Sequence, residues 1–390
     1  MTQIPLLILS DSPTANTGLA RICRDLATRI HAFLPDKFRV GTIGYAGVGS
    51  RHLEFPQYSI QSSVTTNGWY VPELKQVWED FAGGERGVVL TIWDPSRMRW
   101  FVDPQHCPHP EIAAWLTAPP FERWGYFPVD ASGPNSKLTA SLCETIKGYG
   151  RILCYSEWAA SIVGNTIGRH PIDSLPHGID TSVFTPRDKG KARKHFRNIG
   201  FASLSDSSLL VGIVATNQAR KDFALGLETC ALLAENGDRD VRAWIHTDAI
   251  KRYWDLVALI TDFGLLGRVL ISIDNYTDEQ MSWLYSACDV TLGIGLGEGF
   301  GFPIFESLAC GVPVVHGNYG GAAEHLQVGL VSAEMYRKEG QFNCVRPVFD
   351  PRCWAACGST MVGLPTQLPD YLDWNNLWPR WSDWLTKGAK

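Results

Sequence analysis

GEGFGFPIFESLACGVPVV (residues 297–315) decides how the rest of this chain is interpreted. It begins with a glycine-rich loop, which lets backbone N–H groups approach a ligand closely. Pro303 suits the first turn of a helix, because the N–H groups of that turn have no intrahelical partner. Gly311 predicts that this helix ends after about two turns. The valines that follow predict a short buried strand over residues 312–315.

The junction of this loop and helix is a candidate anion site, since the free N–H groups and the helix dipole point at the ligand. Two carboxylates occupy the same stretch, Glu298 in the loop and Glu306 on the helix, with seven residues between them. Carboxylates repel phosphate, so these two are better suited to accept hydrogen bonds from sugar hydroxyls on either side of it. A ligand with phosphates in the middle and a sugar at each end is a nucleotide sugar.

The Glu298-x7-Glu306 pattern, with its embedded glycines and prolines, resembles the donor-site signature of retaining GT-B glycosyltransferases, especially glycosyltransferase family 4. The resemblance implies that Glu298 contacts the transferred sugar and that Glu306 holds the ribose hydroxyls. It places the backbone of Gly299, Phe300 and Gly301 against the sugar and diphosphate. It also implies that no metal or cofactor is obligatory and that the donor substrate is a nucleotide-diphosphate sugar, with a UDP-sugar favoured. An ordinary buried loop and helix of an α/β domain is the alternative.

Length and composition describe a globular protein of two domains. The chain has 390 residues, 45% of them hydrophobic and 19% charged, which is too long for one comfortable core and too apolar for disorder. The net charge of −5 argues against a protein that is basic all over. The ten cysteines are scattered, which predicts a reduced, cytoplasmic protein. The apolar start lacks a basic region, which predicts that there is no membrane anchor. For a viral protein, the expected compartment is the host cytoplasm.

The resemblance implies an α/β fold of the GT-B type, in which two Rossmann-like domains face each other across a cleft and a C-terminal helix returns to the first domain. Residues 6–9 and 209–215 read as the first strands of the two domains. We therefore expect an acceptor-side domain over residues 1–178 and a donor domain over residues 179–365. An aromatic helical segment, residues 366–390, is expected to pack on the first domain, although Pro379 interrupts its helical pattern.

Candidate residues of the first domain follow its predicted strands. Gly18 and Arg21 resemble the glycine loop and arginine with which the family covers the donor diphosphate, although a solvated helix charge is an equal alternative for Arg21. Asp94 and Arg97 follow the strand 88–93 and are placed to meet the acceptor, since ligands gather at the carboxyl ends of strands. A turn or cap role is as well supported for Asp94. Asp130 ends the strand near residues 124–129, where many family members carry histidine.

Arg220 and Lys221 follow the strand 209–215 and suit a diphosphate, because arginine binds it through two hydrogen bonds and lysine acts as a point charge. The resemblance implies that both stabilise the departing nucleotide phosphate, while Glu298 positions the sugar. That phosphate takes the proton of the acceptor in a retaining reaction. An inverting transferase that uses Asp94 or Asp130 as its base is the chemical alternative.

Residues 106–109 are a candidate metal site, because His106, Cys107 and His109 lie close together. A zinc site needs a fourth ligand, which the neighbouring sequence does not offer. Three interleaved prolines favour a surface loop instead. No metal ligand is therefore predicted.

The acceptor is the least defined part of the prediction. The N-terminal pattern resembles phage and environmental glycosyltransferases, some of which modify hydroxymethylated pyrimidines, so double-stranded DNA is a candidate acceptor. The cations and the aromatic residue available for DNA are Arg51, His52, Arg97, Arg99, Trp100 and the basic run 187–197. A solvated helix is the alternative for that run. A saccharide, small-molecule or protein acceptor is the rival prediction, and a non-catalytic nucleotide-sugar-binding protein is a second class.

Overall fold

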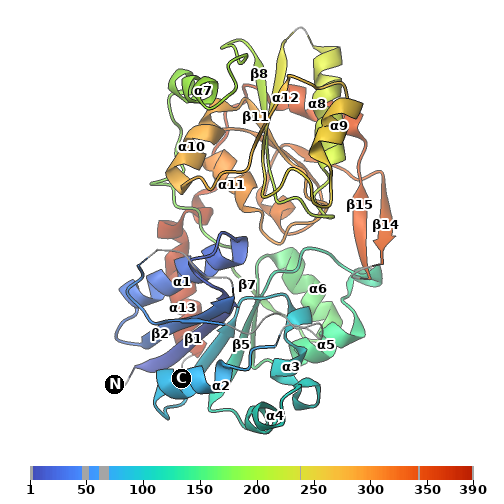
Figure 1. Ribbon diagram of the computed structural model, residues 1–390. Helices are drawn as coiled ribbons and strands as arrows, with labels where there is room; N and C mark the ends of the chain where they lie inside the picture. The colour runs from blue at the N-terminus through green and yellow to red at the C-terminus, as the bar shows by residue number, and fades with distance from the viewer. Residues whose placement is uncertain (1–2, 46–51, 61–69, 238, 341–342, 389–390) are drawn as a thin grey trace. The chain divides into compact units, whose positions relative to one another are not determined.

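The computed structural model describes residues 3–45, 52–60, 70–237, 239–340 and 343–388. The chain divides into unit 1, which is Met1–His177 with Trp378–Lys390, and unit 2, which is Gly178–Leu377. Each unit has its own parallel sheet with helices around it, so the prediction of two Rossmann-like α/β domains is confirmed (Figure 1). The divisions lie at 177/178 and 377/378, compared with the expected 178/179 and 365/366.

The sheet of unit 1 has seven parallel strands in the order β3-β2-β1-β4-β5-β6-β7. Strand β1 lies in the middle and is buried along almost its whole length, which explains its continuous apolar run. The chain order reverses between β1 and β4, so the topological switch point of this sheet lies at their carboxyl ends. The strands are β1 (Ile4–Asp11), β2 (Phe38–Tyr45), β3 (Gln57–Ser59), β4 (Gly87–Thr91), β5 (Phe121–Phe127), β6 (Arg151–Cys154) and β7 (Asp173–Ser174).

The first helix of unit 1, α1 (Gly18–Phe33), buries the face that the sequence pattern marks as apolar and packs on β1 and β2. Thr17 caps it by accepting a hydrogen bond from the N–H of Ala20 at 3.0 Å. The other helices of unit 1 are α2 (Leu74–Ala82), η1 (Pro95–Arg97), α3 (Arg99–Val102), η2 (Pro104–His106), α4 (Pro110–Leu116), η3 (Pro134–Ser136), α5 (Ala140–Lys147) and α6 (Glu157–Ile167).

The last helix, α13 (Trp374–Gly388), runs through Pro379 without a break, so the expected interruption there is wrong. Packing explains why the helix continues. The Trp381 indole is fully buried and donates to the Pro176 carbonyl at 3.1 Å. The Arg151 guanidinium lies over the Trp384 ring at 4.0 Å and donates to the Trp384 carbonyl at 2.9 Å. These contacts offset the loss of the backbone hydrogen bond that Pro379 cannot donate.

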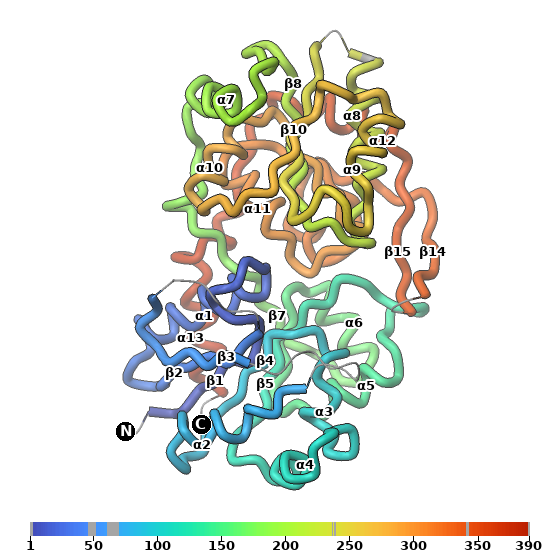
Figure 2. The backbone as a smooth tube through the Cα atoms, viewed as in Figure 1, coloured from blue at the N-terminus to red at the C-terminus, as the bar shows by residue number. Residues whose placement is uncertain are grey.

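The sheet of unit 2 has six parallel strands in the order β10-β9-β8-β11-β12-β13, and its switch point lies between β8 and β11. A separate antiparallel hairpin, β14 with β15, stands apart from this sheet (Figure 2). The strands are β8 (Leu209–Val214), β9 (Val241–His246), β10 (Val269–Ser272), β11 (Val290–Gly293), β12 (Val314–Gly317), β13 (Leu330–Val331), β14 (Met335–Glu339) and β15 (Cys344–Val348).

Helices cover both faces of this second sheet. Helix α8 packs on α9 and α12, whereas α10 packs on α7 and α11 (Figure 1). No helix in the described ranges is long and apolar enough to cross a membrane. The helices of unit 2 are α7 (Lys189–Asn198), α8 (Phe223–Asn236), α9 (Leu256–Asp262), α10 (Asp278–Ala287), α11 (Phe302–Ala309), η4 (Ala322–His325), α12 (Pro351–Met361) and η5 (Asp370–Leu372).

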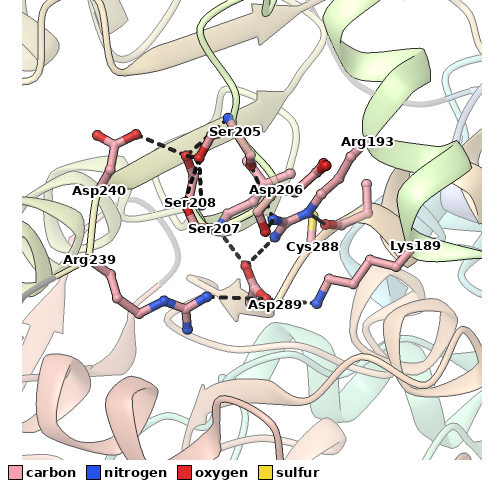
Figure 3. Close-up of polar contacts among 12 residues, drawn as sticks. Lys189, Arg193, Ser205, Asp206, Ser207, Ser208, Arg239, Asp240, Cys288 and Asp289 are labelled. Atoms are coloured by element: carbon pink, nitrogen blue, oxygen red, sulfur yellow. Dashed lines mark hydrogen bonds and ion pairs between the residues drawn. The ribbon is translucent and has the colours of Figure 1, made fainter.

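The basic run 187–197 forms most of α7, and its cations are largely engaged within unit 2. The Arg193 side chain is 2% exposed and binds the Asp289 carboxylate at 2.6 Å (Figure 3). Lys189 contacts the same carboxylate at 2.7 Å, and Arg197 pairs with Asp206 at 2.8 Å. The alternative of a solvated helix therefore does not hold for Arg193, whereas Lys191 and Lys194 are exposed as that alternative expects. Asp289 precedes β11 and needs cations because it is itself buried.

Candidate functional site

The carboxyl ends of β8 and β11 flank the switch point of unit 2, and each is followed by predicted site residues. Arg220 and Lys221 come after β8, and Glu298 comes after β11. The two segments are joined by backbone hydrogen bonds. Leu296 N–H donates to the Arg220 carbonyl at 2.8 Å, and Asp222 N–H donates to the Ile294 carbonyl at 3.0 Å. The structure therefore brings these residues together where an open parallel sheet binds its ligands.

Asn217 holds the first of these segments in place. It is fully buried, its amide donates to the Trp254 carbonyl at 2.8 Å, and its side-chain oxygen accepts from the Trp254 N–H at 2.8 Å. The Trp254 indole in turn donates to the Lys221 carbonyl at 2.7 Å. The backbone beneath the two cations is therefore anchored before any ligand arrives, as a preorganised site requires.

Glu298 is 8% exposed and binds both cations. Arg220 Nη1 donates to Glu298 Oε2 at 3.1 Å and to the Gly297 carbonyl at 3.1 Å. Lys221 Nζ contacts the other carboxylate oxygen, Oε1. Burial alone would raise the pKa of the Glu298 carboxyl, but Lys221 and Arg220 outweigh burial and lower that pKa to about 2. The carboxylate is therefore ionised at neutral pH.

The glycine-rich loop leads into α11 as the sequence predicts. Gly301 has φ +90°, which favours glycine, and no side chain caps the helix that follows it. The Phe300 ring is 3% exposed and packs on Phe305 at 4.6 Å between ring centroids. The ring of Phe300 is therefore taken up by packing, so Phe300, like Gly299 before it, leaves only its backbone for a ligand.

Glu306 lies on the buried side of α11 and is 5% exposed. Its Oε2 accepts a hydrogen bond from the Tyr285 hydroxyl of α10 at 2.8 Å. Tyr285 is fully buried, so it orients this carboxylate from inside the unit. Sequence reasoning missed Tyr285, because nothing in the local pattern of α10 connects it with α11.

Gly18 and Arg21, the predicted donor contacts of unit 1, lie on the first turn of α1. Gly18 is exposed as the first helical residue, and the Arg21 guanidinium is 3.8 Å from the Asp25 carboxylate. Thr17, which precedes Gly18, donates to Asp11 Oδ2 at 2.6 Å. The hydrogen bond ties the start of this helix to the carboxyl end of β1.

Asp94, Arg97 and Asp130 gather at the carboxyl edge of the unit 1 sheet. The Asp94 carboxylate caps η1 by accepting from the Ser96 N–H at 2.8 Å, so its cap role is realised. Burial raises the pKa of the Asp94 carboxyl; the Ser96 hydrogen bonds oppose this rise, and the Asp130 carboxylate adds to it. Arg97 lies 3.9 Å from the Asp11 carboxylate. Asp11 was not predicted as a site residue. The signal was available, because Asp11 lies at the carboxyl end of β1, as Asp94 lies near the carboxyl end of β4.

The candidate metal ligands have other contacts. His106 Nδ1 lies 2.9 Å from the Asp103 carboxylate, and the Cys107 thiol is 3.6 Å from the His109 carbonyl. In the part of the chain that the structure describes, no three His, Cys, Asp or Glu side chains are grouped as a metal site would require.

His316 is a second residue that sequence reasoning missed. It lies within β12, next to the last residue of that strand, its side chain is fully buried, and its Nδ1 is 2.6 Å from the Gly293 carbonyl. The Glu298 carboxylate and the Lys221 ammonium both act on its imidazole. A polar residue directly after the buried strand predicted at residues 312–315 was the available signal.

The part of unit 2 that contains these residues matches a known family. Residues 208–343 match the family described as glycosyl transferases group 1. The D-inositol 3-phosphate glycosyltransferase of Mycobacteroides abscessus is 30% identical over 156 residues, which are 38% of this chain and 32% of that protein. The protein of the same name from Stackebrandtia nassauensis is 27% identical over 239 residues, 54% of this chain and 51% of that protein. The chain thus spans about a third to a half of these curated relatives.

Solved structures match over nearly the whole chain. Anabaena Alr3699/HepE in complex with UDP and glucose has a TM-score of 0.66 at 18% identity, covering 92% of this chain and 89% of that one. WaaG, a glycosyltransferase involved in lipopolysaccharide biosynthesis, has a TM-score of 0.60 at 14% identity, covering 92% of this chain and 94% of that one. At these identities the likeness shows the fold.

Proposed function

We propose that this GT-B protein, whose residues 208–343 match the group 1 glycosyl transferases, moves a hexosyl or pentosyl group from a nucleotide-diphosphate sugar to an acceptor hydroxyl with retention of configuration. One observation carries the proposal. Two cations and one ionised carboxylate, Arg220, Lys221 and Glu298, meet at the switch point of the unit 2 sheet. Cations suit the diphosphate, and the carboxylate suits the sugar hydroxyls.

The pairing within this site indicates how a donor would enter it. Glu298 binds both Arg220 and Lys221. A diphosphate would compete with Glu298 for the two cations, because both are acceptors of charge-assisted hydrogen bonds. The released carboxylate would then accept hydrogen bonds from the transferred sugar. The N–H groups of Gly299–Gly301 would face the phosphates, and Glu306 would hold the ribose. A UDP-sugar is the first donor to test, since Alr3699/HepE was solved with UDP-glucose.

The transfer exchanges one C–O bond for another at the anomeric carbon. The bond to the departing phosphate breaks while the acceptor oxygen bonds on the same face, and the acceptor proton passes to the phosphate oxygen. Nucleoside diphosphate and glycosylated acceptor leave. Arg220 and Lys221 stabilise the negative charge that grows on the phosphate. In the inverting alternative, Asp94 or Asp130 would take the proton instead, and burial already raises the pKa of Asp94.

For the acceptor we favour a saccharide or small hydroxyl compound over DNA. Several features considered for DNA binding are engaged elsewhere: Trp100 is 5% exposed and packs on Tyr70, Arg99 binds Asp103 at 2.9 Å, and Arg193 binds Asp289. Arg51 lies outside the described residues. Duplex DNA with hydroxymethylated pyrimidines stays the second candidate, supported by the sequence resemblance alone. A protein acceptor and the cytoplasmic location stay predictions.

A donor and acceptor screen tests the proposal. The protein is incubated with UDP-, GDP- and ADP-sugars, alone and with saccharides, inositol phosphates or hydroxymethylpyrimidine duplexes, and nucleotide release and product mass are measured. We expect one donor to release its nucleotide, faster with the right acceptor, and NMR of the product to show retained configuration. Donor binding without release under any acceptor would favour the non-catalytic binding protein, and inversion would promote Asp94 or Asp130 to base.

A further inference from the structure

The His316 imidazole is held in one tautomer by its surroundings. Its Nδ1 faces the Gly293 carbonyl at 2.6 Å. A carbonyl oxygen only accepts hydrogen bonds, so Nδ1 carries the proton of the neutral ring and Nε2 keeps a bare lone pair. Nε2 is buried and has no hydrogen-bond partner among the described residues. Buried polar atoms without partners are uncommon, and this one lies in the candidate donor site.

Two glycines make the space in which His316 and Glu298 lie. A Cβ atom at Gly293 would be 3.0 Å from His316 Nδ1, and one at Gly295 would collide with the Glu298 carboxylate. Residues 293 and 295 are alternate positions of one extended stretch. Gly293 is the last residue of β11, and Gly295, two residues later, forms a β-bridge with Lys221. Alternate positions face the same side of a strand. The imidazole and the carboxylate therefore lie next to each other on one face.

We propose that His316 is a positioning residue for the proposed transfer: its neutral ring keeps Glu298 paired with Lys221 and Arg220 until the donor arrives. The inference rests on the proposed function. A ring with a bare lone pair offers the Glu298 carboxylate no proton, so Glu298 keeps its two cations as partners. A protonated ring would instead offer an N–H to Glu298 and add a third positive charge beside Lys221 and Arg220. Both changes favour an incoming diphosphate, because Glu298 is drawn away from the two cations that the diphosphate must take and the site becomes more positive.

The charges around the imidazole determine the pH at which His316 becomes protonated. Burial lowers the pKa of His316; the Gly293 hydrogen bond and the Glu298 carboxylate raise it, the Lys221 ammonium lowers it, and the net direction is downward. His316 is therefore neutral at neutral pH and gains its proton on the acid side of the ordinary histidine range. Glu298 itself titrates only near pH 2, so it stays ionised through that window.

The test is the affinity for UDP-glucose between pH 4.5 and 8, measured by calorimetry with folding checked by circular dichroism at each pH. Both phosphates of this ligand are esterified, so neither has the second phosphate proton that titrates near pH 6. The variants are His316→Asn, whose amide can replace Nδ1 but leaves nothing at Nε2, and His195→Asn on α7 as the matched control. His316→Gln is the second variant if the first does not fold.

We expect the wild-type affinity to rise at acid pH, by up to about tenfold per pH unit for a single linked proton. The His195→Asn control should show the same acid limb, whereas His316→Asn or His316→Gln should bind like the wild type at pH 7.5 and lack the limb. A flat wild-type profile, or an unchanged limb in the His316 variants, would overturn the inference alone. If the wild type bound no nucleotide sugar at any pH, the proposed function would fall, and this inference with it.

Discussion

Arg220 and Glu298 are 78 residues apart in the sequence, yet Arg220 Nη1 donates to Glu298 Oε2 over 3.1 Å. The two residues follow β8 and β11, the strands on either side of the switch point in unit 2. Lys221 binds the same carboxylate and is 8% exposed. A carboxylate that is buried with two cations is a structural element, and the proposed function also makes it a ligand group; the two roles can be separated by experiment.

Replacing Glu298 with Gln should destabilise the protein, because it leaves the buried Lys221 ammonium without its counter-charge. Removing one partner of a buried pair costs roughly 3–5 kcal/mol, and the partial exposure of Arg220 places the expected loss near the lower figure. Urea unfolding measures it. The double variant Lys221→Met with Glu298→Gln should recover part of the loss, since no unpaired lysine remains. Additive effects of the two substitutions would contradict the pairing.

The same carboxylate should make stability depend on acid pH. The pKa of Glu298 is lowered from 4.5 to about 2 in the folded protein. A depressed carboxyl pKa contributes stability that is complete above pH 4.5 and is lost as the pH falls toward 2. The difference in unfolding free energy between wild type and Glu298→Gln should therefore shrink between pH 4.5 and 2, measured by urea titration at each pH. A difference that stays constant would show that Glu298 is not depressed.

Glu306→Ala should weaken donor binding, because the ribose hydroxyls would lose a charged acceptor that contributes roughly 1.5–3 kcal/mol. Calorimetry with the active nucleotide sugar measures this. Tyr285→Phe is the matched control, since it keeps the carboxylate and removes only the 2.8 Å hydrogen bond that orients it. Its effect should be the smaller of the two. Unchanged donor affinity in Glu306→Ala would remove Glu306 from the site.

Arg220→Gln should lower kcat more than it weakens ground-state donor binding, since charge on the departing phosphate is greatest in the transition state. Steady-state kinetics on the active donor, together with calorimetric donor binding, separate the two effects. Arg97→Gln in unit 1 is a useful comparison, because Arg97 is proposed on the acceptor side and its variant should leave donor binding alone. Equal kcat in Arg220→Gln would end the diphosphate role.

Asp289→Asn should reduce stability without changing donor affinity. Asp289 lies at the amino end of β11, where it binds Arg193 at 2.6 Å and accepts from the Leu210 N–H of β8 at 2.7 Å. The loss should be about 3 kcal/mol in urea unfolding, because Arg193 is left buried and unpaired. Asp240→Asn, which alters a more exposed pair with Arg242, should cost less than about 1 kcal/mol. A large fall in donor affinity of folded Asp289→Asn would contradict a purely structural role.

The sequence by itself determined much of the local structure and supplied the residues of the candidate site. Strand β1 is a continuous apolar run, the α1 pattern has helical spacing, and Pro303 and Gly311 mark the two ends of α11. These features depend on residues a few positions apart, which is the range over which backbone sterics and hydrophobic periodicity act. Arg220 and Lys221 were predicted from their place after a parallel strand, and Glu298 from the glycine-rich loop and its spacing to Glu306.

Only the tertiary structure decided which of these groups are partners. The sequence does not show that Glu298 binds both cations, that Tyr285 orients Glu306, or that His316 is buried beside them. It also left a solvated helix open as the alternative for the run that contains Arg193 and marked Pro379 as an interruption of the helical pattern, whereas Arg193 is buried and the helix continues. The physical reason is common to all of them. The free energy of a buried charge or of a strained turn depends on atoms that folding brings from distant parts of the chain, and no local pattern contains those atoms.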